Sequence, residues 1–217
     1  MSGRRPRIAL VDYGAGNLRS VAKALERSEM EPVVTGDPAV VRALDGVLLP
    51  GVGAFRDAVQ ALEKAGLVDA IRDVTQNHRR PYLGLCFGLQ LLFDEGEEHG
   101  RTPGFGIFSG RVTRFPESDP QGRPLCVPHI GWNEVRFAGD HPMLEALPER
   151  DIFYFVHSYR PVPEDPSIVV GRTDHGGEFA AAVARDNIFA VQFHPEKSQS
   201  AGKRLLDAYR RWLETSR

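Results

Sequence analysis

One cysteine of this chain has glycines two residues away on each side, in the stretch "GLCFG" at residues 84–88. The apolar run "YLGLC" predicts a strand that ends there, and "FGLQLLFDEG" predicts a helix that follows. Cys86 therefore lies at a strand-to-helix turn, where flanking glycines permit a tight bend that displays the side chain instead of burying it. The amides at the start of the helix would favour a thiolate and could receive an oxyanion, as a cysteine nucleophile requires.

A cysteine nucleophile needs a general base, and one of the seven histidines is best placed for that role. The apolar segment "IFAVQFHPE" predicts a strand that delivers His194 at its carboxyl end, with Glu196 two residues later. Catalytic groups of a doubly wound sheet gather at the carboxyl ends of its strands. We therefore predict a triad of Cys86, His194 and Glu196, in which Glu196 orients the imidazole.

Metal chemistry fits the same histidines less well. Zinc deaminases also use the spacing His-x-Glu, but no P-C-x-x-C sequence follows Glu196 to supply further ligands. A site built from some mixture of His129, His157 and His194 stays open, although no pair of them has the i, i+4 spacing of a helical zinc motif. We expect neither a metal nor a cofactor.

Two further glycine pairs precede predicted helices. In "LLPGVGAF", Gly51 and Gly53 leave backbone amides uncovered, so that these amides can rotate toward a developing oxyanion. In "DYGAGNLRS", the pair resembles the start of a dinucleotide-binding loop, but Arg19 stands where the third glycine would be. A nucleotide site is therefore disfavoured, and we expect Asn17 to cap the helix that follows.

The elements that must position these groups alternate between strand and helix over the first hundred residues. This alternation predicts a parallel sheet with helices on both faces. Later segments, each short and bounded by Pro, Gly or Asp, predict antiparallel strands added to the same body. We predict one α/β domain over residues 1–217, with a doubly wound, mainly parallel sheet. The predicted strands are 7–13, 32–36, 46–51, 82–86, 105–115, 132–137, 152–159, 167–173, 178–186 and 188–194, and the predicted helices are 17–29, 38–44, 54–79 with a break at Gly66, 87–96 and 200–214.

Composition excludes several classes of function. The chain has 217 residues, of which 41% are hydrophobic, and a net charge of −2. This charge does not favour binding to nucleic acid or to a membrane surface. No apolar run approaches the roughly 20 residues that cross a bilayer, and no signal-peptide pattern opens the chain, so we expect a cytoplasmic protein. The two cysteines lack a C-x-x-C pairing, and we expect Cys126 to be an inert buried thiol.

Cys86 in "GLCFGLQ", the strand end "PGVG" and the "HPE" near the C-terminus together resemble the class I (triad) glutamine amidotransferase family over most of the chain. Within that family, "VDYGAGNLRSV", "PGVGAF", "PHIGWN", "YFVHSY" and "QFHPEKS" are similar to the branch that serves imidazole glycerol phosphate synthases in histidine biosynthesis. The chain departs from the family at Phe87, where leucine or another small apolar residue is usual, and at Ala15, where methionine or proline is common. We expect neither of these two side chains to touch a reacting group.

The resemblance implies that the triad hydrolyses glutamine to glutamate and ammonia through a thioester on Cys86. It also implies that the amides of Val52 and Phe87 form the oxyanion hole, the former after a peptide rotation at Gly51. The positions that match those holding the polar ends of the substrate are Gln90, Glu98, His157, Ser158 and Tyr159.

The resemblance further implies a partner, since free ammonia would be protonated and lost in water. The partner would be a separate (β/α)₈ cyclase subunit in a heterodimer, with Asn17, Tyr154 and Lys197 at the contact. Three alternatives stay open. These are a stand-alone cysteine hydrolase such as a γ-glutamyl hydrolase or peptidase, a glutaminase of another synthase such as the pyridoxal phosphate one, and a non-catalytic subunit with a vestigial triad.

Overall fold

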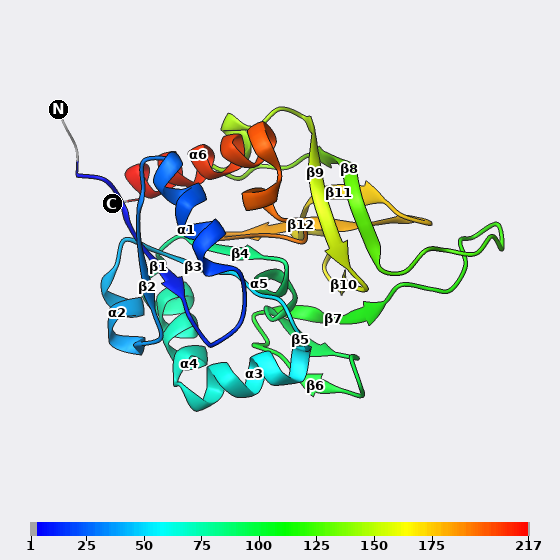
Figure 1. Cartoon of the computed structure of the whole chain (residues 1–217), viewed down its shortest axis with the longest axis horizontal. Helices are drawn as coiled ribbons and strands as arrows, with labels where there is room; N and C mark the ends of the chain where they lie inside the picture. The colour runs from blue at the N-terminus through cyan, green and yellow to red at the C-terminus, as the bar shows by residue number, and fades with distance from the viewer. Residues whose placement is uncertain (1–3, 217) are drawn as a thin grey trace.

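A computed structural model describes residues 4–216 and shows two β-sheets with helices packed around the larger one (Figure 1). Over these residues the larger sheet has nine strands. In spatial order they are β2 (Glu31–Thr35), β1 (Arg7–Val11), β3 (Gly46–Leu49), β4 (Tyr82–Leu85), β13 (Ile188–Val191), β12 (Glu178–Arg185), β11 (Val169–Asp174), β8 (His129–Phe137) and β9 (Arg150–His157).

The first five strands of this order pair in parallel, and the remaining strands continue the same sheet in antiparallel pairings. Every residue of β3, β4 and β13 is buried, as expected for parallel strands covered on both faces. The predicted α/β class, with a parallel core and added antiparallel strands, is confirmed.

Alternating side chains of the parallel strands supply two apolar cores, one on each face of the sheet. On one face, Ile8 and Leu10 belong to the core that α1 (Leu18–Arg27) and α6 (Gln199–Thr215) cover. On the other face, Ala9 and Val11 belong to a core covered by three helices and a π-helical turn. These are α2 (Pro38–Ala43), α3 (Phe55–Lys64), α4 (Leu67–Arg72) and the turn Asp73–Asn77. Figure 1 shows the two helical layers above and below the sheet.

The break predicted at Gly66 is confirmed, because this residue has a left-handed φ of 68° between α3 and α4. Short 3₁₀ turns add to the helical segments at Leu144–Ala146, Pro166–Ile168 and Pro195–Lys197. Among the helices that the structure describes, none is both long and apolar enough to cross a membrane.

The predicted helix over residues 87–96 is wrong beyond its first turn. The helix α5 ends at Gln90, and Phe93–Gly96 forms strand β5. The carbonyls of Leu91, Leu92 and Phe93 accept hydrogen bonds from the amides of residues 105–108, so a later segment takes the place of helical partners. The result is a second sheet of four described strands, in the order β10 (Tyr159–Pro163), β7 (Phe108–Arg114), β5 and β6 (Thr102–Pro103).

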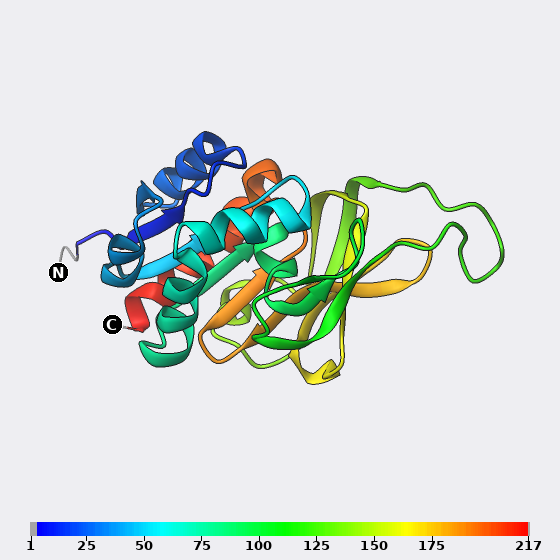
Figure 2. The ribbon, with the colours of Figure 1, turned by 90° about the horizontal axis from the view of Figure 1, so that it is seen from below.

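The loop between β7 and β8 projects from the end of the molecule that carries the antiparallel strands (Figure 2). Cys126 lies on this loop and is exposed, so the expectation of a buried thiol is wrong. The apolar neighbours in "PLCVPHI" suggest a core strand, but the chain reaches the sheet only at His129, where β8 begins.

Candidate active site

Cys86 is held in a strained turn between β4 and α5. Its φ of 54° and ψ of −99° lie in a region that residues other than glycine rarely adopt. A Cβ at Gly84 would lie 2.4 Å from the carbonyl oxygen of Gly88, and a Cβ at Gly88 would lie 2.0 Å from that of Leu49. Glycine is therefore required on both sides of the turn, as the spacing predicts.

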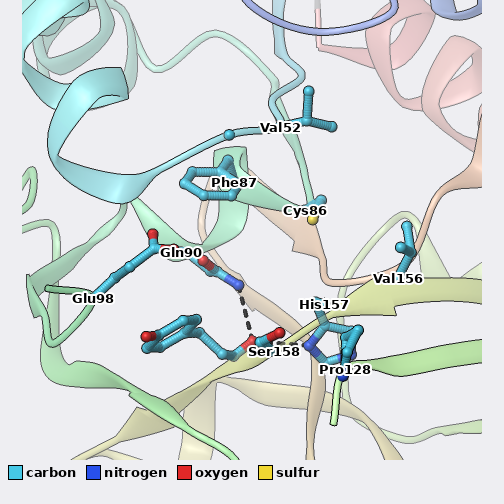
Figure 3. Close-up of a pocket in the computed structure, with 11 residues that line it drawn as sticks. Val52, Cys86, Phe87, Gln90, Glu98, Pro128, Val156, His157 and Ser158 are labelled. Atoms are coloured by element: carbon cyan, nitrogen blue, oxygen red, sulfur yellow. Dashed lines mark hydrogen bonds between the residues drawn. The ribbon is translucent and has the colours of Figure 1, made fainter.

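The thiol itself is enclosed. Cys86 is only 3% exposed, so the expectation that the turn displays it instead of burying it is wrong. The sulfur instead faces a pocket of about 260 Å³, with Val52 and Phe87 among the walls that close around it (Figure 3). A substrate must reach Cys86 through this pocket.

His194 and Glu196 follow the end of β13, which pairs in parallel with β4. The register places Val191 opposite Leu85, so the segments that follow β13 and β4 leave the sheet at the same edge. His194 Nδ1 lies 2.8 Å from Glu196 Oε1, and both side chains are 5% exposed. An ionised Glu196 accepts from Nδ1–H, which leaves Nε2 as the nitrogen available to Cys86.

The electrostatics of His194 favour the imidazolium. Burial alone would lower its pKa, but interactions with Cys86 and Glu196 raise it to about 10. Nε2 has no hydrogen-bond partner among residues 4–216, although the thiol is close enough to contribute to this shift. A protonated His194 beside the sulfur can stabilise a thiolate and donate a proton to a leaving group.

All five residues predicted to bind substrate line the same pocket as Cys86. Gln90 Nε2 donates to the carbonyl of Tyr159 at 3.0 Å, which ties α5 to β10. Glu98 Oε2 accepts from the backbone amide of Phe55 at 2.7 Å, at the start of α3, whose N-cap residue provides no side-chain cap. Glu98 thus holds a helix terminus while lining the pocket with a carboxylate.

The predicted oxyanion strand also borders this pocket. Val52 lines it and is 43% exposed, whereas Gly51 is buried. A Cβ at Gly51 would lie 2.3 Å from Tyr13 Oη and 2.7 Å from the Cβ of Phe87. The peptide before Val52 is therefore packed between two side chains, and Val52 and Phe87 both lie beside the thiol (Figure 3).

Comparison with known families identifies the chain. The family described as "Glutamine amidotransferase class-I" matches residues 9–208. The chain belongs to this family. The pocket that Cys86 lines, and the His194–Glu196 pair that interacts with this thiol, thus belong to a class-I glutamine amidotransferase.

Curated relatives are similar over nearly the full length of this amidotransferase. It is 48% identical over 210 residues to the "Imidazole glycerol phosphate synthase subunit HisH" of Methylococcus capsulatus, covering 94% of this chain and 96% of the relative. It is 50% identical over 200 residues to the protein of the same name from Syntrophotalea carbinolica, covering 92% and 97%. These identities extend the relationship from the family to the HisH branch.

Solved structures share the fold at low sequence identity. The amidotransferase superimposes with a TM-score of 0.75 on the structure of PurLQS from Thermotoga maritima, at 20% identity and covering 96% of this chain and 99% of that one. A crystal structure described as a glutamine amidotransferase gives a TM-score of 0.68 at 20% identity, covering 96% and 98%. Both support the fold class.

Two of the three residues predicted to contact a partner lie side by side. Lys197 is exposed, and its Nζ lies 5.8 Å from the ring centroid of the half-buried Tyr154. The third, Asn17, is also exposed, and its side chain accepts from the amide of Ser20 at 3.2 Å, so the predicted N-cap is confirmed.

Two polar side chains beside Cys86, the buried Gln192 and the half-buried Tyr13, were not predicted from the sequence. Gln192 Nε2 donates to Cys86 Sγ at 3.5 Å, and Tyr13 Oη is buried without a hydrogen-bond partner among the described residues. The signal for Gln192 was a single amide within the apolar run "IFAVQF", where a buried polar group must find a partner.

The histidines considered for a metal site have other partners. His129 Nδ1 and His157 Nε2 lie 3.1 Å apart, and His194 is paired with Glu196. Among residues 4–216, no group of three or more His, Cys, Asp or Glu side chains could hold a metal ion.

Proposed function

We propose that this chain is the glutaminase subunit of an imidazole glycerol phosphate synthase, acting in histidine biosynthesis. The observation that carries the proposal is the position of Cys86 on a pocket, with the His194–Glu196 pair close enough to the sulfur for Cys86 to help raise the pKa of His194. The identity of about half of all residues with proteins named HisH narrows the function to this synthase.

In the proposed reaction, the Cys86 thiolate attacks the side-chain amide carbon of glutamine. The carbonyl oxygen becomes an oxyanion that the amides of Val52 and Phe87 stabilise. His194 then gives its proton to the departing nitrogen, so that the C–N bond breaks and ammonia leaves behind a γ-glutamyl thioester. Water attacks the thioester, His194 accepts a proton from it, and glutamate departs from the restored thiolate. The new γ-carboxyl group loses its remaining proton to solvent, so that one glutamine and one water give one glutamate, one ammonia and one proton.

The remaining walls of the pocket suit the other end of glutamine. The carboxylate of Glu98 would attract the α-ammonium group, while Gln90 and the β9–β10 residues His157, Ser158 and Tyr159 offer amide and carbonyl groups to the substrate's polar atoms. A pocket of about 260 Å³ has room for an amino acid.

The partner in this proposal is a separate (β/α)₈ cyclase that uses the ammonia. A contiguous apolar surface supports it: Ile130, Trp132 and Ile152 are 59%, 50% and 53% exposed on strands β8 and β9. Trp132 stands opposite Tyr154 in the strand pair, and their rings meet edge to face at 5.9 Å. Solvent-exposed aromatic and aliphatic clusters of this kind mark protein interfaces.

This surface is connected to the catalytic base through the backbone. The carbonyl of Tyr154 accepts from the amide of His194 at 2.9 Å, and the amide of Tyr154 donates to Ser198 Oγ at 3.0 Å. A partner bound to β8 and β9 could therefore shift the segment that carries His194 through these two hydrogen bonds. We propose that docking changes glutaminase turnover by this route.

The test is glutamate release from glutamine by the purified chain, alone and with the cyclase and its nucleotide ligand. We expect slow release alone and a large rise in the complex. Equal and substantial rates in both conditions would indicate a stand-alone hydrolase, and stimulation by a different synthase would reassign the partner. Cys86→Ala is the matched control, because it should fold and bind the cyclase yet release no glutamate.

A further inference from the structure

Gln192 is the polar side chain packed directly beneath the nucleophile. It is 0% exposed and follows β13, whose last residue Val191 accepts a hydrogen bond from the amide of Cys86 at 2.7 Å. Its Nε2 lies 3.5 Å from Cys86 Sγ, an ordinary distance for an N–H···S hydrogen bond. The side chain thus touches the reacting sulfur from the buried side, and it is not among the residues that line the pocket.

The orientation of this amide is fixed by a second glutamine. Gln90 Nε2 lies 3.0 Å from the carbonyl oxygen of Tyr159 and 3.0 Å from Gln192 Oε1. Because the carbonyl can only accept, the Gln90 atom between them must be the donating nitrogen. Gln192 Oε1 is then occupied as an acceptor, and only its N–H can face the sulfur.

The carbonyl that sets this order is itself held in place. His157 Nδ1 lies 2.8 Å from the same oxygen of Tyr159 and donates to it. The donor and the acceptor of every hydrogen bond between His157 and Cys86 are therefore fixed. His157 and Gln90 both donate to the carbonyl of Tyr159, Gln90 also donates to Gln192 Oε1, and Gln192 Nε2 donates to the sulfur. If the Gln192 amide rotated by half a turn, its Nε2 would face Gln90 Nε2, and two donors would meet with no acceptor between them.

A donor fixed in this way favours one form of the sulfur. A thiolate accepts a hydrogen bond from N–H more strongly than a thiol does, and in a buried site the difference is large because water is excluded. The titratable groups that interact with Cys86 are His194 after β13 and Tyr13 after β1, and Glu98, His157 and Tyr159 line the same pocket. Unlike these groups, the Gln192 amide does not titrate, so it can donate to the sulfur at any pH.

We propose that Gln192 is a positioning residue for the nucleophile, which holds the Cys86 sulfur at the pocket and stabilises its thiolate through an amide oriented by Gln90. The proposal deepens the glutaminase function proposed above and rests on it for the catalytic readout alone. Its central readout, the reactivity of the thiol, does not require glutamine to be the substrate.

The experiment measures the rate of Cys86 alkylation by iodoacetamide from pH 5 to 10 in the full chain. The Cys86→Ala protein provides the background from Cys126. The test variants are Gln192→Met, which is close in size and has no donor, and Gln192→Glu, which places a carboxylate beside the sulfur. We expect the midpoint of the profile to move up by about one pH unit in Gln192→Met and by more in Gln192→Glu.

Glutaminase kinetics in the complex should change in parallel. We expect kcat to fall about tenfold in Gln192→Met with little change in KM, because Gln192 does not line the pocket. A matched control is Thr75→Val, which removes another buried hydrogen bond, from Thr75 Oγ1 to the carbonyl of Ile71 at 2.8 Å. This variant should lose stability and keep the alkylation profile of the wild type.

A folded Gln192→Met protein with an unshifted alkylation profile would overturn the proposal and leave Gln192 a space-filling residue. If both Gln192 variants fail to fold, Gln90→Met decides, because it frees the Gln192 amide to rotate. A shift in the same direction would support the proposal, and an unshifted profile would overturn it. A shifted profile in a protein that hydrolyses no glutamine under any condition would instead refute the proposed substrate while supporting the role of Gln192.

Discussion

At the scale of single residues, the carboxylate of Glu196 carries a testable share of the chemistry. It holds His194 in one tautomer and favours its charged form. Glu196→Gln keeps an oxygen for Nδ1–H but removes the charge, so the imidazolium that must protonate ammonia is less stable. We expect kcat for glutamine hydrolysis to fall by about 10⁴-fold, as it does when the acid of a serine-protease triad is neutralised, with KM nearly unchanged.

The control for this variant is its melting temperature, which should stay close to that of the wild type if only the charge matters. Steady-state assays in the complex measure both constants. A rise in KM with unchanged kcat would place Glu196 in substrate binding and not in the triad.

At the scale of elements, the pairing of β8 with β9 buries two neutral histidines. His157 Nδ1 donates to Tyr159, so its Nε2 must accept from His129 Nδ1–H across the strand pair. Burial lowers the pKa of His157 to about 3 and that of His129 to about 4. Weaker interactions with neighbouring groups modify the effect of burial at both histidines. A proton on His157 would put two donors face to face.

This pairing predicts a loss of stability in acid. Above about pH 6.5 the rings are neutral in both the folded and the unfolded chain, and the full stability is present. As the pH falls from 6.5 toward 4, only the unfolded chain takes up protons, so the free energy of unfolding decreases. In urea titrations at pH 7 and 4.5, His129→Gln should lose less stability than the wild type. The control is His99→Gln, at an exposed position, which should lose as much stability between pH 7 and 4.5 as the wild type. An equal loss of stability in the two variants would contradict a role for the buried histidines.

The start of α1 depends on Asn17, which is also a predicted partner contact. Asn17→Ala removes the cap on the amide of Ser20 and should lower the free energy of unfolding by about 1 kcal/mol. Asn17→Asp keeps a capping oxygen and should retain wild-type stability in urea titrations. If the partner recognises the Asn17 amide nitrogen, both variants bind it more weakly, which separates docking from folding. Equal destabilisation of the two variants would show that the cap is not the source of the effect.

Local patterns explain which elements could be predicted. The strands and helices before residue 86 are each specified by their own periodicity and end signals, and all of them are found within a few residues. The segment 91–96 could not be predicted, because its helical pattern yields to hydrogen bonds from residues 105–108. The second sheet forms when segments such as β7 and β10 pair with each other. No short-range pattern in the sequence indicates this pairing.

The same limit applies to the site. Cys86, His194 and Glu196 follow from residue types at strand ends, whereas the contact of Gln192 with Cys86 joins residues 106 positions apart. Likewise, the enclosure of Cys86 depends on walls from the β3–α3 loop, α5 and β9 that come together only in the folded chain. The positions of these three residues at strand ends were thus more predictable than the burial of Cys86.

At the scale of the whole molecule, one continuous sheet joins the proposed triad to the proposed docking surface. Its parallel part ends at β4 and β13, which carry Cys86 and His194, and its antiparallel part ends at β8 and β9. The pocket is completed by residues of both parts, Val156 of β9 among them. Val156 stands opposite Ile130, so the apolar surface begins at the wall of the pocket. A partner placed there would lie next to the point where ammonia is released.

This placement predicts the effect of removing the largest exposed side chain of the surface. Trp132→Ala should weaken binding to the cyclase about 10- to 100-fold, as expected for a central aromatic contact in an interface. The melting temperature and the glutaminase rate of the isolated chain should stay nearly unchanged, because Trp132 is 50% exposed and does not line the pocket. Titration calorimetry with the purified cyclase measures the affinity.

Val34→Ala supplies the comparison, since Val34 is 48% exposed on β2 at the opposite edge of the same sheet. It should bind the cyclase like the wild type. If Trp132→Ala and Val34→Ala bind equally well, the β8–β9 surface is not the docking site. If Trp132→Ala binds weakly yet reaches the full stimulated rate at saturating cyclase, the surface provides affinity while another contact carries the signal to His194.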